Sequence, residues 1–292
     1  MSNVSLYGLL LQPFVEFGFM RRALVAVLAL ALGAAPLGCL LVLRRMSLVG
    51  DAIAHALLPG AAIGYLVAGF SLVAMSGGGF VAALTVALLS AAVARATAQR
   101  EDASFAAFYL IALALGVLLI SVRGSSVDLV RVLFGTVLAV DDAALLLIAA
   151  VSSVSLLALA LLYRPLVIEC FDPQFQRGRD GALAHLVLLV LTVANMVAGF
   201  QALGTLMAVG LRILPAVAAR FWAAEVWSLA LAAAAIAAGA GIAGLLFSYH
   251  AQSPTGPSIV IAAGIVYVAS LVVGPRDSLR ARAGRPVGPR RR

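Results

Sequence analysis

The 292-residue chain contains no lysine, because all twenty of its basic residues are arginine. This absence excludes two kinds of chemistry. The phosphate-binding loop GxxxxGK[ST] needs a lysine that reaches the phosphates of a bound nucleotide, and Schiff-base catalysis needs a lysine amine. We therefore expect no ATP hydrolysis by such a loop within this chain.

Charged residues and cysteines are also scarce. Only 11% of the residues are charged and 64% are hydrophobic, whereas soluble domains are usually about 45–50% apolar. This composition excludes an ordinary soluble domain and predicts a polytopic membrane protein. The two cysteines, Cys39 and Cys170, show no metal-ligand spacing, and we expect no structural disulfide.

The net charge of +8 could indicate a nucleic-acid partner, but seven arginines lie at 276–292, directly after an apolar segment. Arginines in that position are typical of a membrane topology signal. We therefore expect the lipid bilayer as a partner, and no nucleic acid.

Apolar stretches of about 20 residues are long enough to cross a bilayer as helices. They predict an all-α transmembrane bundle of about nine spans, within a range of eight to ten. We expect an interfacial segment at 1–22, a transmembrane domain at 23–274 and a disordered, arginine-rich tail at 275–292. The predicted spans are 23–43, 51–69, 73–94, 104–122, 140–162, 182–200, 202–219, 228–247 and 257–274.

The arginines also predict the orientation of the chain. With the C-terminal tail in the cytoplasm, fifteen of the twenty arginines fall on the cytoplasmic side of this layout. The N-terminus then lies outside, and the long polar loop at 163–181 lies inside.

Asp51 and His55 stand four positions apart in an otherwise apolar stretch. On a helix this spacing places both side chains on one face, where a carboxylate and an imidazole suit zinc, manganese or ferrous iron. Ionisable residues at membrane depth usually face a bundle interior or an aqueous path. The alternative is a packing pair in which Asp51 caps its helix and His55 donates to a backbone carbonyl.

Three further features are candidates for function. The sequence Phe171-Asp172-Pro173 predicts the start of a helix with Asp172 as its N-cap. This would be a short helix at the membrane face. His250 lies at the predicted outer mouth, where it could receive ions or belong to a plain turn. Arg212 lies inside a span and needs a partner, for which Asp51 is one candidate, unless its side chain snorkels to the inner face.

Several motifs resemble those of the membrane permeases of zinc/manganese-type ABC importers, which have a type II importer fold. GDAIAHALLPG at 50–60 is the most specific of them. The others are VDLVRVLFGTVLAV at 127–140, FDPQF at 171–175, GTLMAVGLRILPAVAAR at 204–220 and SYHAQSPTGPSIV at 248–260.

The resemblance implies a permease that is not itself an enzyme, working as a homodimer in the plasma (inner) membrane. Two copies of a separate ATPase would bind at the cytoplasmic face, and a soluble metal-binding protein would deliver the ion outside. Phe171, Asp172 and Pro173 would form the coupling element, and Asp51 and His55 would meet the ion. No permanently bound cofactor is implied, and the cargo would be Zn²⁺ or Mn²⁺.

Three alternatives stay open: a ferric-chelate or vitamin B12-type permease, an ion-coupled secondary metal carrier, and an intramembrane enzyme. The sequence does not separate zinc, manganese and iron, although the histidine slightly favours zinc. Two departures from the family pattern are QFQRGRD after Pro173, at 174–180, and Arg212 in an ordinarily apolar place.

Overall fold

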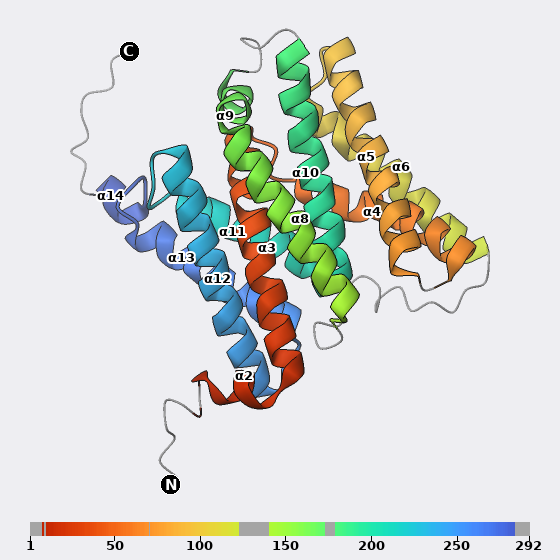
Figure 1. The fold of residues 1–292 in the computed structure, drawn as a ribbon. Helices are drawn as coiled ribbons and strands as arrows, with labels where there is room; N and C mark the ends of the chain where they lie inside the picture. The colour runs from red at the N-terminus through yellow and green to blue at the C-terminus, as the bar shows by residue number, and fades with distance from the viewer. Residues whose placement is uncertain (1–7, 9, 70, 123–139, 173–178, 284–292) are drawn as a thin grey trace, which may run out of the picture.

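The computed structural model describes residues 8, 10–69, 71–122, 140–172 and 179–283, and these contain helices and no strand (Figure 1). The helices are α2 (Gln12–Glu16), α3 (Gly18–Leu43), α4 (Val49–Ala68), α5 (Leu72–Ala96), α6 (Glu101–Val122), α8 (Asp142–Leu161), α9 (Tyr163–Phe171), α10 (Arg179–Leu203), α11 (Thr205–Ala219), α12 (Val226–Ala251), α13 (Thr255–Val273) and α14 (Leu279–Ala283).

Among the described residues, eight helices are long and apolar enough to cross a membrane, and α11 is a shorter apolar helix. With α11 counted, they match the predicted spans one for one. The boundary between α10 and α11 was marked only by glycines in the sequence. The boundary lies at Gly204, the N-cap of α11, whose backbone φ of 87° favours glycine.

The first span differs from its predicted limits. Helix α3 begins at Gly18 instead of at residue 23, and the only helix described before it is α2, with five residues. The first turn of α3 therefore contains Arg21, whose side chain donates to the carbonyl of Val15. Nearby, Arg22 Nε lies 3.2 Å from an Asp142 carboxylate oxygen. These partners let the helix extend through two arginines. The motif at 127–140 lies outside the described residues except for Val140.

The spanning helices form two groups joined by α10. In one group, α4 packs on α5 and α6; in the other, α3 packs on α8, α11 and α12, and α13 packs on α11 and α12. Helix α10 contacts members of both groups and lies between them in Figure 1. A displacement on one side of the bundle can therefore reach the other side through α10.

Helices α4 and α5 approach closely because glycines face each other. A Cβ added at Gly60 would lie 2.0 Å from the carbonyl oxygen of Gly78, and one at Gly64 would lie 2.3 Å from that of Ala74. Small residues at such crossings let helix backbones pack tightly in a membrane. The glycines therefore fix α4, the helix that carries Asp51 and His55, against its neighbour.

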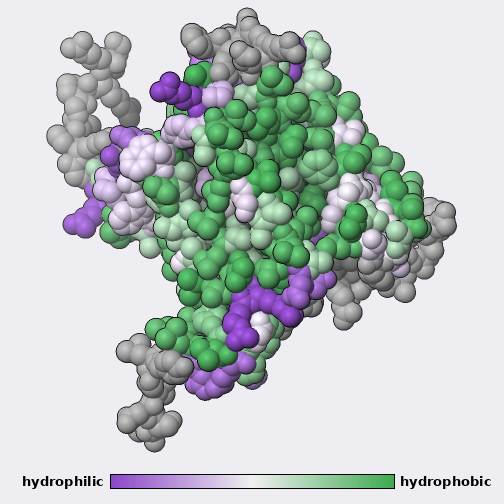
Figure 2. All heavy atoms as spheres, in the orientation of Figure 1, coloured by the Kyte–Doolittle hydropathy of each residue, from purple (hydrophilic) through white to green (hydrophobic). Residues whose placement is uncertain are grey.

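The surface fits a lipid environment. Figure 2 shows that apolar residues cover most of the visible face, with polar residues gathered near its ends. Large apolar side chains are widely exposed, such as Val67 at 80% and Val73 at 81%. In water such a surface would be a strong liability, whereas hydrocarbon chains solvate it.

The segment after the last span is folded over part of its length. The tail that we expect to be disordered begins at residue 275, and in its described part the backbone N–H of Arg276 donates to the carbonyl of Phe221 at 3.1 Å. The short helix α14 follows, at Leu279–Ala283. Residues 284–292 lie outside the described part of the chain.

Candidate functional site

Asp51 and His55 lie side by side on one face of α4, as their spacing predicts. His55 Nε2 is 3.9 Å from Asp51 Oδ1. Asp51 sits in the first turn, where a carboxylate is favoured by the helix dipole. It does not cap the helix, because the N-cap is Leu48 and receives no side-chain hydrogen bond. The packing alternative, in which Asp51 caps α4, is therefore not what the structure shows.

Tyr109 of α6 joins this pair. Its ring stacks on the imidazole of His55 with a centroid distance of 6.0 Å and an interplanar angle of 26°. The stacking limits how the imidazole can rotate. His55 Nδ1 is buried and hydrogen-bonded to no described protein atom. Sequence reasoning missed Tyr109, because 54 residues separate it from His55 and no local pattern connects them.

The pair is open on one side of the chain. The side chains of Asp51 and His55 are 57% and 36% exposed, although they lie in a segment of membrane-spanning character. Within the described residues, no three His, Cys, Asp or Glu side chains converge as a metal-binding group. Two side chains alone would hold a divalent cation weakly, and its further ligands would have to come from water or from another polypeptide.

Arg212 does not form the expected pair with Asp51. Its side chain is fully buried, and in the described structure its hydrogen-bond partner is the carbonyl of Thr192, at 3.2 Å from Nη2. The Nε and Nη1 groups have no partner there. Glycines on neighbouring helices make room for this residue, since a Cβ at Gly38 would lie 2.2 Å from the Arg212 carbonyl oxygen. The snorkelling alternative is likewise not observed.

His250 lies in the last turn of α12, with its ring edge-on to that of Tyr249 at 5.1 Å. Tyr249 in turn packs on Phe17, at the N-terminal end of α3. Helix α4 starts after the opposite end of α3. The structure therefore does not bring His250 into a group with Asp51 and His55.

The predicted helix start at Phe171, Asp172 and Pro173 lies where helix α9 ends, and a helix that began at Pro173 would lie outside the described residues, so that helix stays a prediction. Helix α9 finishes at Phe171, and Asp172 is its C-cap with φ −140° and ψ 78°. The sequence LYRPLVIECF begins the helix earlier because Pro165 is tolerated in a first turn. Pro173 lies outside the described residues. A short helix does stand at this end of the bundle, but it precedes the FDP sequence.

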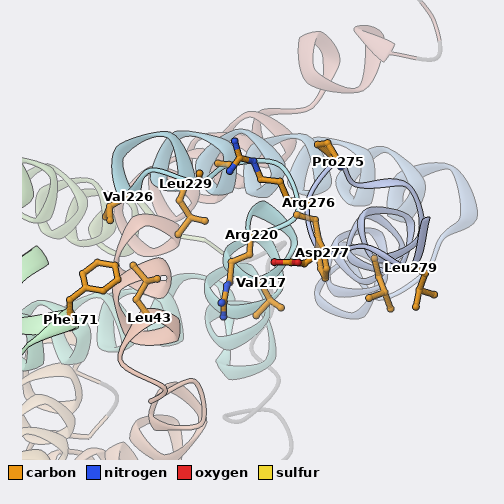
Figure 3. Close-up of a pocket in the computed structure, with 14 residues that line it drawn as sticks. Leu43, Phe171, Val217, Arg220, Val226, Leu229, Pro275, Arg276, Asp277 and Leu279 are labelled. Atoms are coloured by element: carbon orange, nitrogen blue, oxygen red, sulfur yellow. The ribbon is translucent and has the colours of Figure 1, made fainter. Parts of the chain in front are cut away.

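A cleft of about 680 Å³ opens beside the exposed ring of Phe171 (Figure 3). Two cations, Arg220 and Arg276, lie on its wall together with Asp277. Its lining comes from the ends of α3, α9 and α11, from α12, and from the chain that links α13 to α14. This end of the molecule therefore offers an uneven, partly basic surface around the end of α9.

The cysteines take no part in a site. Both thiols are free and buried. Burial raises the pKa of the Cys170 thiol to about 12, so it stays protonated at neutral pH and is a poor metal ligand.

Comparisons with known proteins agree with this architecture. A family model described as the ABC 3 transport family matches residues 16–274. The chain is 33% identical to the manganese import system permease protein ScaB of Streptococcus parasanguinis, over 90% of this chain and 93% of that protein. It is 30% identical to the chelated iron transport system membrane protein YfeD of Yersinia pestis, over 91% of this chain and 89% of that protein.

A solved structure has the same fold. It is PsaBC from Streptococcus pneumoniae in complex with Fab, with a TM-score of 0.80 and 30% identity, and it covers 93% of this chain and 98% of that chain.

Proposed function

Because the chain belongs to the ABC 3 transport family and is the membrane permease of a metal-ion ABC importer, its Asp51–His55 face has a candidate role. We propose that Asp51 and His55 contact the imported cation. ATP hydrolysis belongs to a separate subunit of such an importer, which agrees with the absence of lysine from this chain. The multi-pass helical bundle is that of a membrane-embedded subunit, which we expect in the plasma membrane.

The observation that carries the proposal is the open face of α4. A carboxylate and an imidazole lie within 3.9 Å of each other there, half exposed, in a helix of spanning length. Such a face is costly against acyl chains. It becomes favourable if it lines an aqueous path, where an ion can exchange its waters for weak ligands and leave again.

We propose that a second copy of the chain closes this path. In a homodimer the open faces of two α4 helices would oppose each other, and two copies of the pair would supply four ligands. This arrangement accounts for a site that is incomplete within one chain. The functional unit would then contain two permeases, two ATPase subunits and a soluble metal-binding protein outside.

The orientation follows from the arginines. We propose that α9, α14 and the cleft beside Phe171 face the cytoplasm and receive the ATPase, with the N-terminus outside and the C-terminus inside. The tail beyond α13 carries seven arginines, which favours the cytoplasmic side. Phe171, 63% exposed at the end of α9, is the side chain best placed to enter a pocket of the ATPase. Asp172 and Pro173 would continue this coupling element, and His250 would lie at the outer mouth.

We propose manganese as the first cargo to test. The name of ScaB supports manganese, and that of YfeD supports iron. The donor set of one carboxylate and one imidazole suits Mn²⁺, Fe²⁺ or Zn²⁺, so zinc, which the histidine favours, is the second cargo to test.

The test is uptake of manganese by proteoliposomes that contain the complete importer. Replacement of Asp51 and His55 together by alanine removes both ligands, and we expect uptake to fall by about 10–100-fold, as for lost metal-site residues elsewhere. The matched control is Asp142→Asn, which removes an exposed carboxylate paired with Arg22 at a distant helix start. Uptake at the wild-type rate by the well-expressed double variant would refute the assignment.

A further inference from the structure

Four charged or titratable side chains that the proposed function does not use are buried or mostly buried together at the α9 end of the bundle. Arg44 follows α3 as its C-cap, Glu101 begins α6, Glu169 lies in α9 and His185 lies in α10. We call these residues the four-helix cluster. Their side chains are only 10%, 16%, 5% and 5% exposed, respectively. Charged groups are rarely buried to this extent unless they are paired.

Arg44 bridges the two carboxylates of the cluster. Its Nη1 donates to Glu169 Oε1 at 3.0 Å, and its Nη2 donates to Glu101 Oε2 at 3.2 Å. His185 lies against the same groups, with Nε2 3.0 Å from Glu101 Oε1 and Nδ1 3.4 Å from Glu169 Oε1. It also contacts the Arg44 guanidinium. One planar guanidinium thus holds α9 and α6 to the end of α3.

The cluster does not resemble a metal site. A guanidinium lies between its carboxylates and would repel a cation. Its members instead compensate one another's charge, so removal of one leaves an uncompensated group in a buried position. The arrangement therefore resists independent movement of the helices that supply it.

Two short paths connect the helices held by the cluster to the Asp51–His55 pair. After Arg44, a turn of a few residues that includes Arg45 at a φ of 61° leads into α4 and to Asp51. Along α6, Tyr109 lies eight positions after Glu101, and its ring stacks on His55. At the other side of the cluster, Glu169 lies two residues from the end of α9. One junction thus connects α9 to both helices around the pair.

We propose that Arg44 and Glu169 are positioning residues that transmit the displacement of α9 to the Asp51–His55 pair. This inference rests on the proposed function, in which the ATPase acts on the end of α9. When α9 moves, the buried Arg44–Glu169 contact pulls the α3–α4 turn, and the Arg44–Glu101 contact pulls the start of α6. Networks of packed side chains and salt bridges between rigid helices are one way in which distant sites are coupled.

The decisive variant is Glu169→Gln, which keeps the size of the side chain and removes its charge. ATP hydrolysis and manganese uptake are measured in the same proteoliposomes with the complete importer. We expect hydrolysis within twofold of wild type, and manganese transported per ATP lower by about 5-fold or more, the low end of usual coupling effects. The KM for manganese should stay the same, because Asp51, His55 and Tyr109 are unchanged.

Two comparisons separate transmission from simple destabilisation. The matched control is Asp102→Asn, which removes a carboxylate in the same first turn of α6 that pairs with the exposed Arg100. Asp102→Asn should transport as much manganese per ATP as wild type. Arg44→Gln should transport less manganese per ATP. Arg44→Lys should lie between Arg44→Gln and wild type, because an ammonium lacks the forked geometry that lets a guanidinium bind two carboxylates. The thermal unfolding midpoint of each purified variant shows whether a lower amount of manganese transported per ATP simply accompanies a loss of stability.

The inference is wrong if Glu169→Gln transports as much manganese per ATP as wild type, or if uptake and hydrolysis fall in equal proportion. If Glu169→Gln does not fold, Arg44→Lys decides: a wild-type ratio refutes the inference, and a lowered ratio supports it. Failure of the wild-type importer to take up any divalent metal with ATP is a different result. It would refute the proposed function, and this inference with it.

Discussion

At the scale of single residues, Arg212 stands out because it has the largest side chain among those that are fully buried. One backbone carbonyl accepts from it, and its Nε and Nη1 find no acceptor in the described structure. A buried polar group without a partner costs about 1–3 kcal/mol, and more when it is charged. Its presence in the bundle is therefore not explained by stability.

We predict that Arg212→Met stabilises the protein. Methionine fills much of the same volume without a buried charge, so the free energy of unfolding should rise by about 1–3 kcal/mol. The measurement is the thermal unfolding midpoint in detergent, with manganese uptake recorded in parallel. As the matched control, Arg220→Met replaces an exposed arginine of the cleft and should leave the midpoint nearly unchanged. A lower midpoint for Arg212→Met would show that this cation has a compensating partner.

At the scale of helices, the crossing of α4 and α5 determines where the Asp51–His55 face points. A Cβ at Gly78 would lie 2.2 Å from the carbonyl oxygen of Gly60, which is backbone and cannot rotate away. The two helices therefore cannot keep their present spacing with any larger residue at Gly78.

We predict that Gly78→Ala forces α4 and α5 apart and destabilises the protein by about 1–3 kcal/mol, as overpacking usually does. The neighbouring Gly77 provides the control, since nothing lies within 4 Å of a Cβ added there. Gly77→Ala should be neutral or slightly stabilising, because alanine is the better helix former. Thermal unfolding of both variants checks the prediction, and equal midpoints would contradict it.

At the scale of the whole molecule, the open face of α4 is incomplete in a single chain. On this helix Asp51 is exposed and His55 is half-buried, and Ile63, about two turns after His55, is 50% exposed. If two copies pair through this face, those positions approach their counterparts in the partner.

We predict that Ile63→Cys cross-links two copies of the chain under oxidising conditions in membranes. Native Cys39 and Cys170 are both buried, so they should contribute little background. Leu231→Cys is the control, because Leu231 is 63% exposed on α12, away from the α4 face. The readout is a dimer band on a non-reducing gel. Dimers from the Leu231→Cys variant alone would place the interface on α12 and refute the proposed pairing.

Much of the fold could be predicted from hydropathy, because a chain in lipid must satisfy its backbone hydrogen bonds internally and therefore forms helices. The Asp51–His55 face could be predicted from the helical period. The end of α9 could not, because it depends on where this helix begins: α9 starts at Tyr163 and ends at Phe171. Local cap patterns do not fix that starting point.

The sequence by itself determined the membrane class, the approximate number of spans and the placement of Asp51 and His55 on one helix face, since each depends on residues near in the chain. Only the tertiary structure decided that Tyr109 stacks on His55, that Arg212 donates to the Thr192 carbonyl, and that Arg44 joins Glu169 to Glu101. These contacts connect residues far apart in the sequence. They depend on helix crossings, and no local periodicity encodes which helices cross.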